Sequence, residues 1–221
     1  MLSSDIINML LEGIVDTLRM TLFSTLFAYI IGFPVAVLLV VCRKGGLRPI
    51  PILHGVVDAV VNILRSVPFL ILMLVVTPLT RAIAGRSYGP TAAIVPLTIA
   101  AAPYVARMIE SSLLEVSSGV IEAALSMGAS LKTIILKVLI PEAKTSLIVG
   151  ATISTGTIFG YSAMAGAIGA GGLGDIAIRY GYNRWQPDIL WMTVILLIIL
   201  FQIIQFVGMK ISKKTDKRIR E

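Results

Sequence analysis

Long stretches without a charged side chain constrain this chain more than any other feature. Four of them contain 23, 20, 30 and 21 residues, and they lie between Arg19 and Arg43, Arg86 and Arg107, Lys144 and Asp175, and Asp188 and Lys210. An ionised side chain at the centre of a bilayer costs about 2.5 to 3.5 kcal/mol, and about 20 apolar residues in a helix cross the hydrocarbon layer. Each stretch therefore predicts a membrane-spanning helix.

A fifth span is predicted around the 15 uncharged residues between Arg65 and Arg81. Its extension back to Val56 includes Asp58 and Arg65, which share one helical face and can turn away from lipid. Only 14% of the residues are charged, against about 25% in soluble domains, which excludes a water-soluble fold. We expect an all-α membrane protein with five transmembrane helices, a single domain over residues 1–221. The predicted spans are 16–42, 56–80, 88–110, 145–168 and 188–209, with a connecting loop over 115–144.

The basic residues predict the orientation, because cytoplasmic loops are enriched in Lys and Arg. With the C-terminus in the cytoplasm, 12 basic residues lie inside and 4 outside. The N-terminus is then outside, and an aromatic belt marks the outer end of the last span: Tyr180, Tyr182, Trp185 and Trp191. The net charge of +7 is therefore interpreted as membrane topology rather than as a nucleic-acid-binding surface. A single cysteine, Cys42, and a single histidine, His54, predict neither a disulfide nor a metal site.

The connecting loop, cytoplasmic in this topology, has the pattern of a helix-turn-helix. Gly128 suits the left-handed conformation that ends a helix, Ser130 can cap a second helix, and Pro141 interrupts that helix. An ordinary amphipathic connector is the alternative on these grounds alone.

The loop also resembles the EAA loop of ABC importer permeases. Its positions are occupied by Glu122, Ala123, Ala124, Gly128, Val138, Ile140 and Pro141. Val138 and Ile140 stand where Ile and Leu are more usual. The resemblance implies a coupling helix that docks into a groove on an ATPase subunit, with Glu122 holding the turn or meeting a basic residue across the interface.

Two glycine patterns concern nucleotides. No G-x-x-x-x-G-K-[ST] segment is present, so the chain has no P-loop of its own. Residues 169–174 match G-x-G-x-x-G, but that fingerprint requires a preceding strand in a βαβ unit, and here it follows a long apolar run. We expect a tight re-entry at the outer membrane surface instead. The segment resembles permeases for methionine, osmoprotectants and phosphonates.

The fourth predicted span carries candidate pathway residues. Gly156 and Gly160 form a G-x-x-x-G pair that permits close helix packing, at a subunit interface or within the subunit. Tyr161, Ser162 and Met164 follow, and Met164 lies about 30 Å from Lys144 along a helix. We hypothesise that paired copies of Met164 gate a pore, since Met is flexible and polarizable; a lipid-facing or core Met is the alternative.

Two further patterns concern charged residues within spans. Pro68 is expected to kink the helix predicted over 56–80. Arg65 to Pro68 resembles the Arg-x-x-Pro segment of amino-acid importer permeases, and a snorkelling Arg beside a packing kink is the alternative. Arg107 and Glu110 are three residues apart and can pair on one helix face.

Together these segments resemble the permease of a methionine ABC importer. The resemblance implies a type I importer fold and a homodimer in the bacterial plasma (inner) membrane. It implies two copies of a cytoplasmic ATPase that bind ATP and Mg²⁺, and an external binding protein or lipoprotein that delivers L-methionine, in some cases its D-form or derivatives. Transport would proceed by alternating access, and the chain itself would have no cofactor, metal or catalytic residue. The alternatives are an osmoprotectant or other small-solute permease, a membrane-embedded hydrolase with Ser162 as nucleophile, and a channel or secondary transporter.

Overall fold

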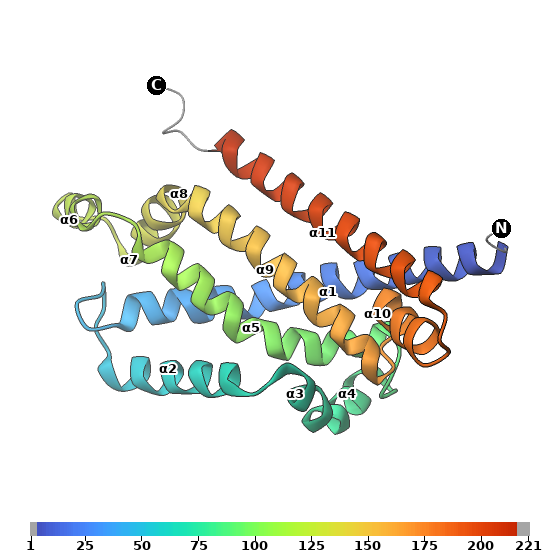
Figure 1. Ribbon diagram of the computed structural model, residues 1–221. Helices are drawn as coiled ribbons and strands as arrows, with labels where there is room; N and C mark the ends of the chain where they lie inside the picture. Colours follow the sequence, from blue (N-terminus) through green and yellow to red (C-terminus); the bar gives the residue numbers. More distant parts are fainter. Residues whose placement is uncertain (1–3, 216–221) are drawn as a thin grey trace. The chain divides into compact units, whose positions relative to one another are not determined.

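A computed structural model describes residues 4–215, whose regular elements are all helices (Figure 1). Four helices within this range are long and apolar enough to cross a membrane: α1 (Ser4–Cys42), α5 (Pro90–Leu114), α9 (Lys144–Ala165, continued to Ile168) and α11 (Pro187–Thr215). A bent pair, α2 (Pro51–Ser66) and α3 (Phe69–Val75), supplies a fifth span if it is counted as one. The expected all-helical membrane fold is confirmed.

The helix α1 begins 12 residues before the predicted span, at Ser4 rather than at residue 16. Absence of charge marks where lipid surrounds a helix, but it does not mark where the helix ends. Asp5 lies in the first turn of α1, where a carboxylate interacts favourably with the helix dipole. The helix therefore continues through its charged N-terminal turns.

The span predicted over 56–80 is not the continuous kinked helix that we expected. The segment 56–80 is divided among α2, α3 and α4 (Thr77–Ala84), and Pro68 is the N-cap of α3 with φ −56° and ψ 134°. Proline lacks an N–H and disfavours the helical conformation of the preceding residue. The backbone therefore leaves the helix at Val67 and Pro68 instead of bending within it.

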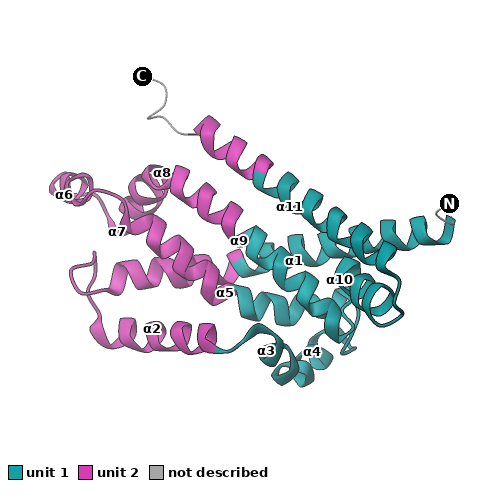
Figure 2. Cartoon of the chain, viewed as in Figure 1, with its two compact units in different colours: residues 1–28, 67–101, 155–205 teal, residues 29–66, 102–154, 206–221 magenta. Residues whose placement is uncertain are grey.

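The chain consists of two compact units, which Figure 2 shows in different colours. Unit 1 comprises Met1–Ala28, Val67–Ala101 and Thr155–Gln205, and unit 2 comprises Tyr29–Ser66, Ala102–Ser154 and Phe206–Glu221. The four long helices each contribute a segment to both units.

Unit 1 is built around two apolar clusters. One contains Met20, Phe69, Met73, Ala93, Leu97, Ala165 and Ala170. The other contains Leu10, Leu173, Ile176 and Ile189.

Glycines allow backbone segments of unit 1 to approach one another closely. A Cβ at Gly166 would collide with the backbone of Gly174 and Asp175, and a Cβ at Gly174 would collide with the Ala163 carbonyl. Gly169, Gly171 and Gly172 all have positive φ. The glycine segment is thus the tight turn that we expected, leading through a 3-10 turn (Gly166–Ile168) into α10 (Gly172–Ile176). Leu173 N–H donates to Thr17 Oγ1 at 2.9 Å and fixes this turn on α1.

Unit 2 contains a charged cluster between α2 and α5. Arg107 on α5 pairs with Glu110 at 2.7 Å, as predicted, and also with Asp58 on α2. The Asn62 amide oxygen accepts a third hydrogen bond from Arg107 at 3.0 Å. Asp58 therefore meets an arginine of another helix, whereas Arg65, seven residues later, is exposed.

Candidate coupling loop and translocation pathway

The turn that ends α6 (Ser118–Ser126) has the geometry of a Schellman motif. Ala129 N–H donates to the Ala124 carbonyl at 3.1 Å, and Gly128 N–H donates to the Leu125 carbonyl at 2.9 Å. These two bonds satisfy carbonyls that a helix end would otherwise leave free. Gly128 has φ +74°, the left-handed conformation that the sequence predicted for it.

The second helical segment of the loop begins at Ser130, again as predicted. The Ser130 hydroxyl oxygen accepts a hydrogen bond from Thr133 N–H at 3.3 Å and caps α7 (Leu131–Thr133). The segment continues as a π-helix, η1 (Ile134–Leu139), and then as α8 (Ile140–Glu142). The helix passes through Pro141 and is interrupted two residues later, at the turn residue Ala143 that precedes α9. Pro141 lacks the N–H that an α-helix would donate to the Lys137 carbonyl, and the wider π turn precedes it.

The EAA-like residues have different environments within this hairpin. Ala124 is buried, with 5% of its surface exposed, and α6 packs against η1, whose Ile134 and Leu139 are also buried. Glu122, Ala123 and Pro141 are exposed, and Val138 and Ile140 are half-buried. One alanine of the motif thus holds the hairpin together, and the other faces outward.

Two residues that the sequence analysis did not select form an exposed apolar surface at the turn. Leu125 and Met127 expose 50% and 81% of their surface. Their signal in the sequence is the presence of two large apolar side chains directly beside the predicted turn at Gly128. Together with Ala123 they form what we call the loop surface.

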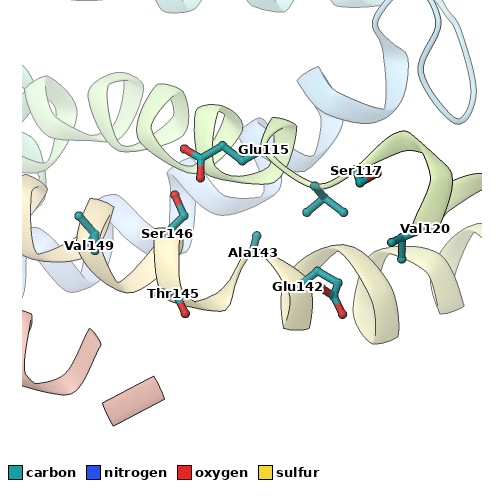
Figure 3. Close-up of a pocket in the computed structure, with 9 residues that line it drawn as sticks. Glu115, Ser117, Val120, Glu142, Ala143, Thr145, Ser146 and Val149 are labelled. Atoms are coloured by element: carbon teal, nitrogen blue, oxygen red, sulfur yellow. The ribbon is translucent and has the colours of Figure 1, made fainter. Parts of the chain in front are cut away.

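Two cavities adjoin the loop in unit 2. The larger, of about 510 Å³, lies between the end of α5, α6, α8 and the start of α9, and its lining includes Glu115, Glu142, Thr145 and Ser146 (Figure 3). The smaller, of about 200 Å³, is lined by both Glu122 and Arg43. Glu122 thus shares a cavity with a basic residue of its own chain.

The three candidate pathway residues on α9 have different surroundings within unit 1. The Tyr161 ring stacks on Phe69 with centroids 4.7 Å apart. Ser162 is buried, with 1% of its surface exposed, and its Oγ donates to the Phe159 carbonyl at 2.7 Å and lies 3.3 Å from Thr21 Oγ1. Met164 exposes 52% of its surface. Among the three, Met164 is the most exposed, Tyr161 is half-buried and Ser162 is buried.

The two glycines of the G-x-x-x-G pair also differ. A Cβ at Gly156 would meet Phe201 and Gln205 of α11, each at 3.0 Å, so Gly156 permits close packing within the chain. A Cβ at Gly160 would meet no atom of the described chain within 4 Å. Gly160 therefore leaves room on the same helix as Met164.

The architecture and the hairpin define a class of protein. Several apolar spans and a helix-turn-helix with an exposed apolar turn are the features expected of a permease subunit of a transport system.

Comparison with known proteins gives the family. The family model described as "Binding-protein-dependent transport system inner membrane component" matches residues 30–221, and the chain belongs to this family. It is 48% identical over 211 residues to a probable D-methionine transport system permease protein of Vibrio cholerae, covering 96% of this chain and 94% of the relative. It is 45% identical over 181 residues to a methionine import system permease protein of Bacillus subtilis, covering 82% of each.

A solved structure gives the same result. A chain of a methionine ABC transporter, determined in inward-facing conformations, superimposes with a TM-score of 0.96 at 46% identity, covering 98% of this chain and 100% of that chain. The fold is therefore that of a type I ABC importer permease. An amino acid ABC transporter at 19% identity, covering 96% of this chain and 94% of that chain, has a TM-score of 0.73 and shows the shared fold alone.

Proposed function

We propose that this chain is the permease subunit of an ATP-driven methionine importer. The observation that carries this proposal is the hairpin of α6 and η1, in which the EAA-like residues are joined by a Schellman turn that exposes Leu125 and Met127. The methionine transport proteins named above, at 45 to 48% identity, support the choice of solute.

The loop surface is the proposed docking site for the ATPase. Exposed apolar side chains at a rigid turn are suited to insertion into an apolar groove, because burying them removes apolar surface from water. Ala123 has no bulk beyond its Cβ and permits close approach. The ATPase would hold ATP and Mg²⁺, and the permease chain would need no cofactor and would catalyse no reaction itself.

Two copies of the chain would enclose the pathway. The exposed side of α9 carries Gly160 and Met164, and a second copy packed there would place two methionines opposite each other. We propose that this pair closes the pathway between transport cycles. Ser162 is buried against Thr21, so we assign it to helix packing rather than to the pathway surface.

The assembly would contain two permease chains, two ATPases and an external methionine-binding protein or lipoprotein, in the bacterial inner membrane. The N-terminus would lie outside and the C-terminus in the cytoplasm, as the excess of basic residues in the coupling loop and the C-terminal segment indicates. ATP binding would move the loop surfaces and switch the pathway between inward and outward access.

A hydrolase is the weaker alternative. The Ser162 Oγ is buried and already donates to a backbone carbonyl, so it is not presented to a substrate as a nucleophile must be.

The solute is tested by competition. The permease, its ATPase and its binding protein are reconstituted in vesicles, and ATP-driven uptake of labelled L-methionine is measured with excess unlabelled D-methionine, choline or betaine. We expect the methionine stereoisomer to compete and the two osmoprotectants to leave uptake unchanged. Competition by choline or betaine but not by methionine would overturn the proposed solute.

A further inference from the structure

A strained tryptophan precedes the last span. Trp185 has φ +55°, the one described non-glycine residue with positive φ. Trp185 N–H donates to the Tyr182 carbonyl at 3.3 Å and Gln186 N–H donates to the Gly181 carbonyl at 3.1 Å. This is the same Schellman pattern that ends α6, with Trp185 in the place of Gly128.

Packing within the chain does not account for this tryptophan. A bulky residue in the left-handed region costs free energy that glycine would not. Its side chain is 87% exposed, so few contacts of the chain itself offset that cost. Strained residues of this kind are found where a side chain must be presented for binding.

Beside Trp185 lies a cavity of about 760 Å³ between the start of α1 and the start of α11. Its apolar lining includes Ile6, Met9 and Met192. Its charged residues are Asp5, Arg184 and Asp188. We call Trp185 and these three charged residues the headgroup site.

The charges of the headgroup site are not neutralised by one another. Among residues 4–215, the ion pairs are those of Arg107 with Asp58 and Glu110 and of Arg179 with Asp175. The Arg184 guanidinium lies over the Tyr180 ring, 4.5 Å from its centroid. One cation and two carboxylates thus line a partly apolar cavity without pairing.

The position of the site along the chain indicates membrane contact. It adjoins the first turns of α11. Only 11% of the apolar 18-residue stretch of this helix is buried, the smallest share among the candidate spans. Trp191, one turn into that helix, is also largely exposed. Tryptophan and tyrosine prefer the headgroup level of a bilayer.

We propose that the headgroup site binds an aminophospholipid of the phosphatidylethanolamine class. The lipid phosphate would lie at Arg184, which can donate several hydrogen bonds to phosphate oxygens. The lipid ammonium would lie between the Asp5 and Asp188 carboxylates, the Trp185 ring would rest at the glycerol level, and the acyl chains would follow the lipid-exposed face of α11. A phosphatidylcholine headgroup has the same charges but no N–H to donate, so it would bind less tightly.

The chain offers a built-in reporter, because it contains two tryptophans. Trp191→Phe leaves Trp185 as the single tryptophan, and Trp185→Phe leaves Trp191, six residues later in the chain, as the matched control. Each full-length variant is reconstituted in phosphatidylcholine vesicles with increasing fractions of brominated phosphatidylethanolamine or brominated phosphatidylcholine. Bromine quenches tryptophan on contact, so the quenching curves report which lipid occupies the site.

At Trp185 we expect brominated phosphatidylethanolamine to quench about threefold more effectively than brominated phosphatidylcholine, a difference in the range of exposed ion pairs. Trp191 should show no preference. Asp5→Asn with Asp188→Asn should abolish the preference at Trp185, whereas Asp175→Asn, which alters a carboxylate outside the site, should keep it.

Three results would overturn the proposal. Equal quenching by both lipids at Trp185 would mean that no headgroup is selected. A preference that survives Asp5→Asn with Asp188→Asn would remove the assigned carboxylates from the site. Quenching at Trp191 but not at Trp185 would place Trp185 outside the bilayer, where it would face a partner protein.

Discussion

Arg107 joins α5 to α2 within unit 2. Its guanidinium is bonded to two carboxylates and one amide from α2 and α5. In a membrane protein such a cation compensates carboxylates that would otherwise be poorly solvated. Its removal would leave Asp58 and Glu110 without a counter-charge.

We predict that Arg107→Gln lowers the free energy of unfolding by about 1 to 3 kcal/mol, less than for a fully buried ion pair, because solvent screens the partly exposed Asp58 carboxylate. Titration of the purified permease with a denaturing detergent measures the change. Arg65→Gln, at an exposed position on α2, is the matched control and should change stability little.

A rescue variant separates charge from packing at the same site. Arg107→Gln combined with Asp58→Asn and Glu110→Gln should recover most of the lost stability, because no uncompensated carboxylate remains. If the triple variant is as unstable as Arg107→Gln, the ion pairs are not the cause.

Met164 is the residue proposed to close the pathway. Met164→Ala should widen the proposed constriction and raise basal ATP hydrolysis and solute leak in the reconstituted complex. Ile195→Ala, at an exposed position on α11, is the control and should change neither. If Met164→Ala leaves both transport and basal hydrolysis unchanged, the gate hypothesis is wrong.

The coupling hairpin shows how much of an element can be predicted from sequence. Gly128 and Ser130 were correctly assigned because caps depend on residues within one turn. The exact effect of Pro141 was not predicted, since a proline inside a helix can kink it, end it or be preceded by a π turn. Likewise, Pro68 was expected to kink a span that it divides.

Gly128→Ala tests the rigidity of the hairpin turn. A Cβ in the left-handed region costs about 1 kcal/mol. We therefore expect the backbone amides at positions 128 and 129 to exchange hydrogen about fivefold faster in the Gly128→Ala variant than in the unsubstituted protein. Gly119→Ala, inside α6 with Ser117 Oγ 3.7 Å from the added Cβ, should not accelerate exchange. Hydrogen-exchange mass spectrometry of the loop peptide distinguishes the two, and equal rates in both variants would contradict the role given to Gly128.

The glycine turn after α9 depends on a close approach between backbone segments. Gly174→Ala would force a Cβ into the Ala163 carbonyl, and this backbone contact cannot relax by a side-chain movement. We expect the variant to fail to accumulate in the membrane. Gly160→Ala, with no described neighbour within 4 Å, should accumulate normally, and an immunoblot of membrane fractions compares them. Normal accumulation of Gly174→Ala would mean that the close approach is not required.

For the molecule as a whole, the sequence predicted the long apolar helices that are candidates to cross a membrane, but not which side chains of distant segments meet. Charge-free length defines spans because lipid excludes charge from each helix independently. Contacts such as Asp58 with Arg107, or Tyr161 with Phe69, join segments far apart in sequence, and no local pattern specifies them. The burial of Ser162 was missed for the same reason.

We expect this permease to move its solute only when a separate ATPase drives the loop surface. The most direct measurement is accumulation of labelled methionine in vesicles containing the permease, its ATPase and its binding protein, with and without ATP on the ATPase side. We predict accumulation against a gradient with ATP and none without it. Leu125→Glu with Met127→Glu, which puts charges on the loop surface, should abolish accumulation, whereas Leu136→Glu, an exposed residue of η1 outside that surface, should retain it. Accumulation without ATP, or undiminished accumulation by the Leu125→Glu and Met127→Glu variant, would contradict the account.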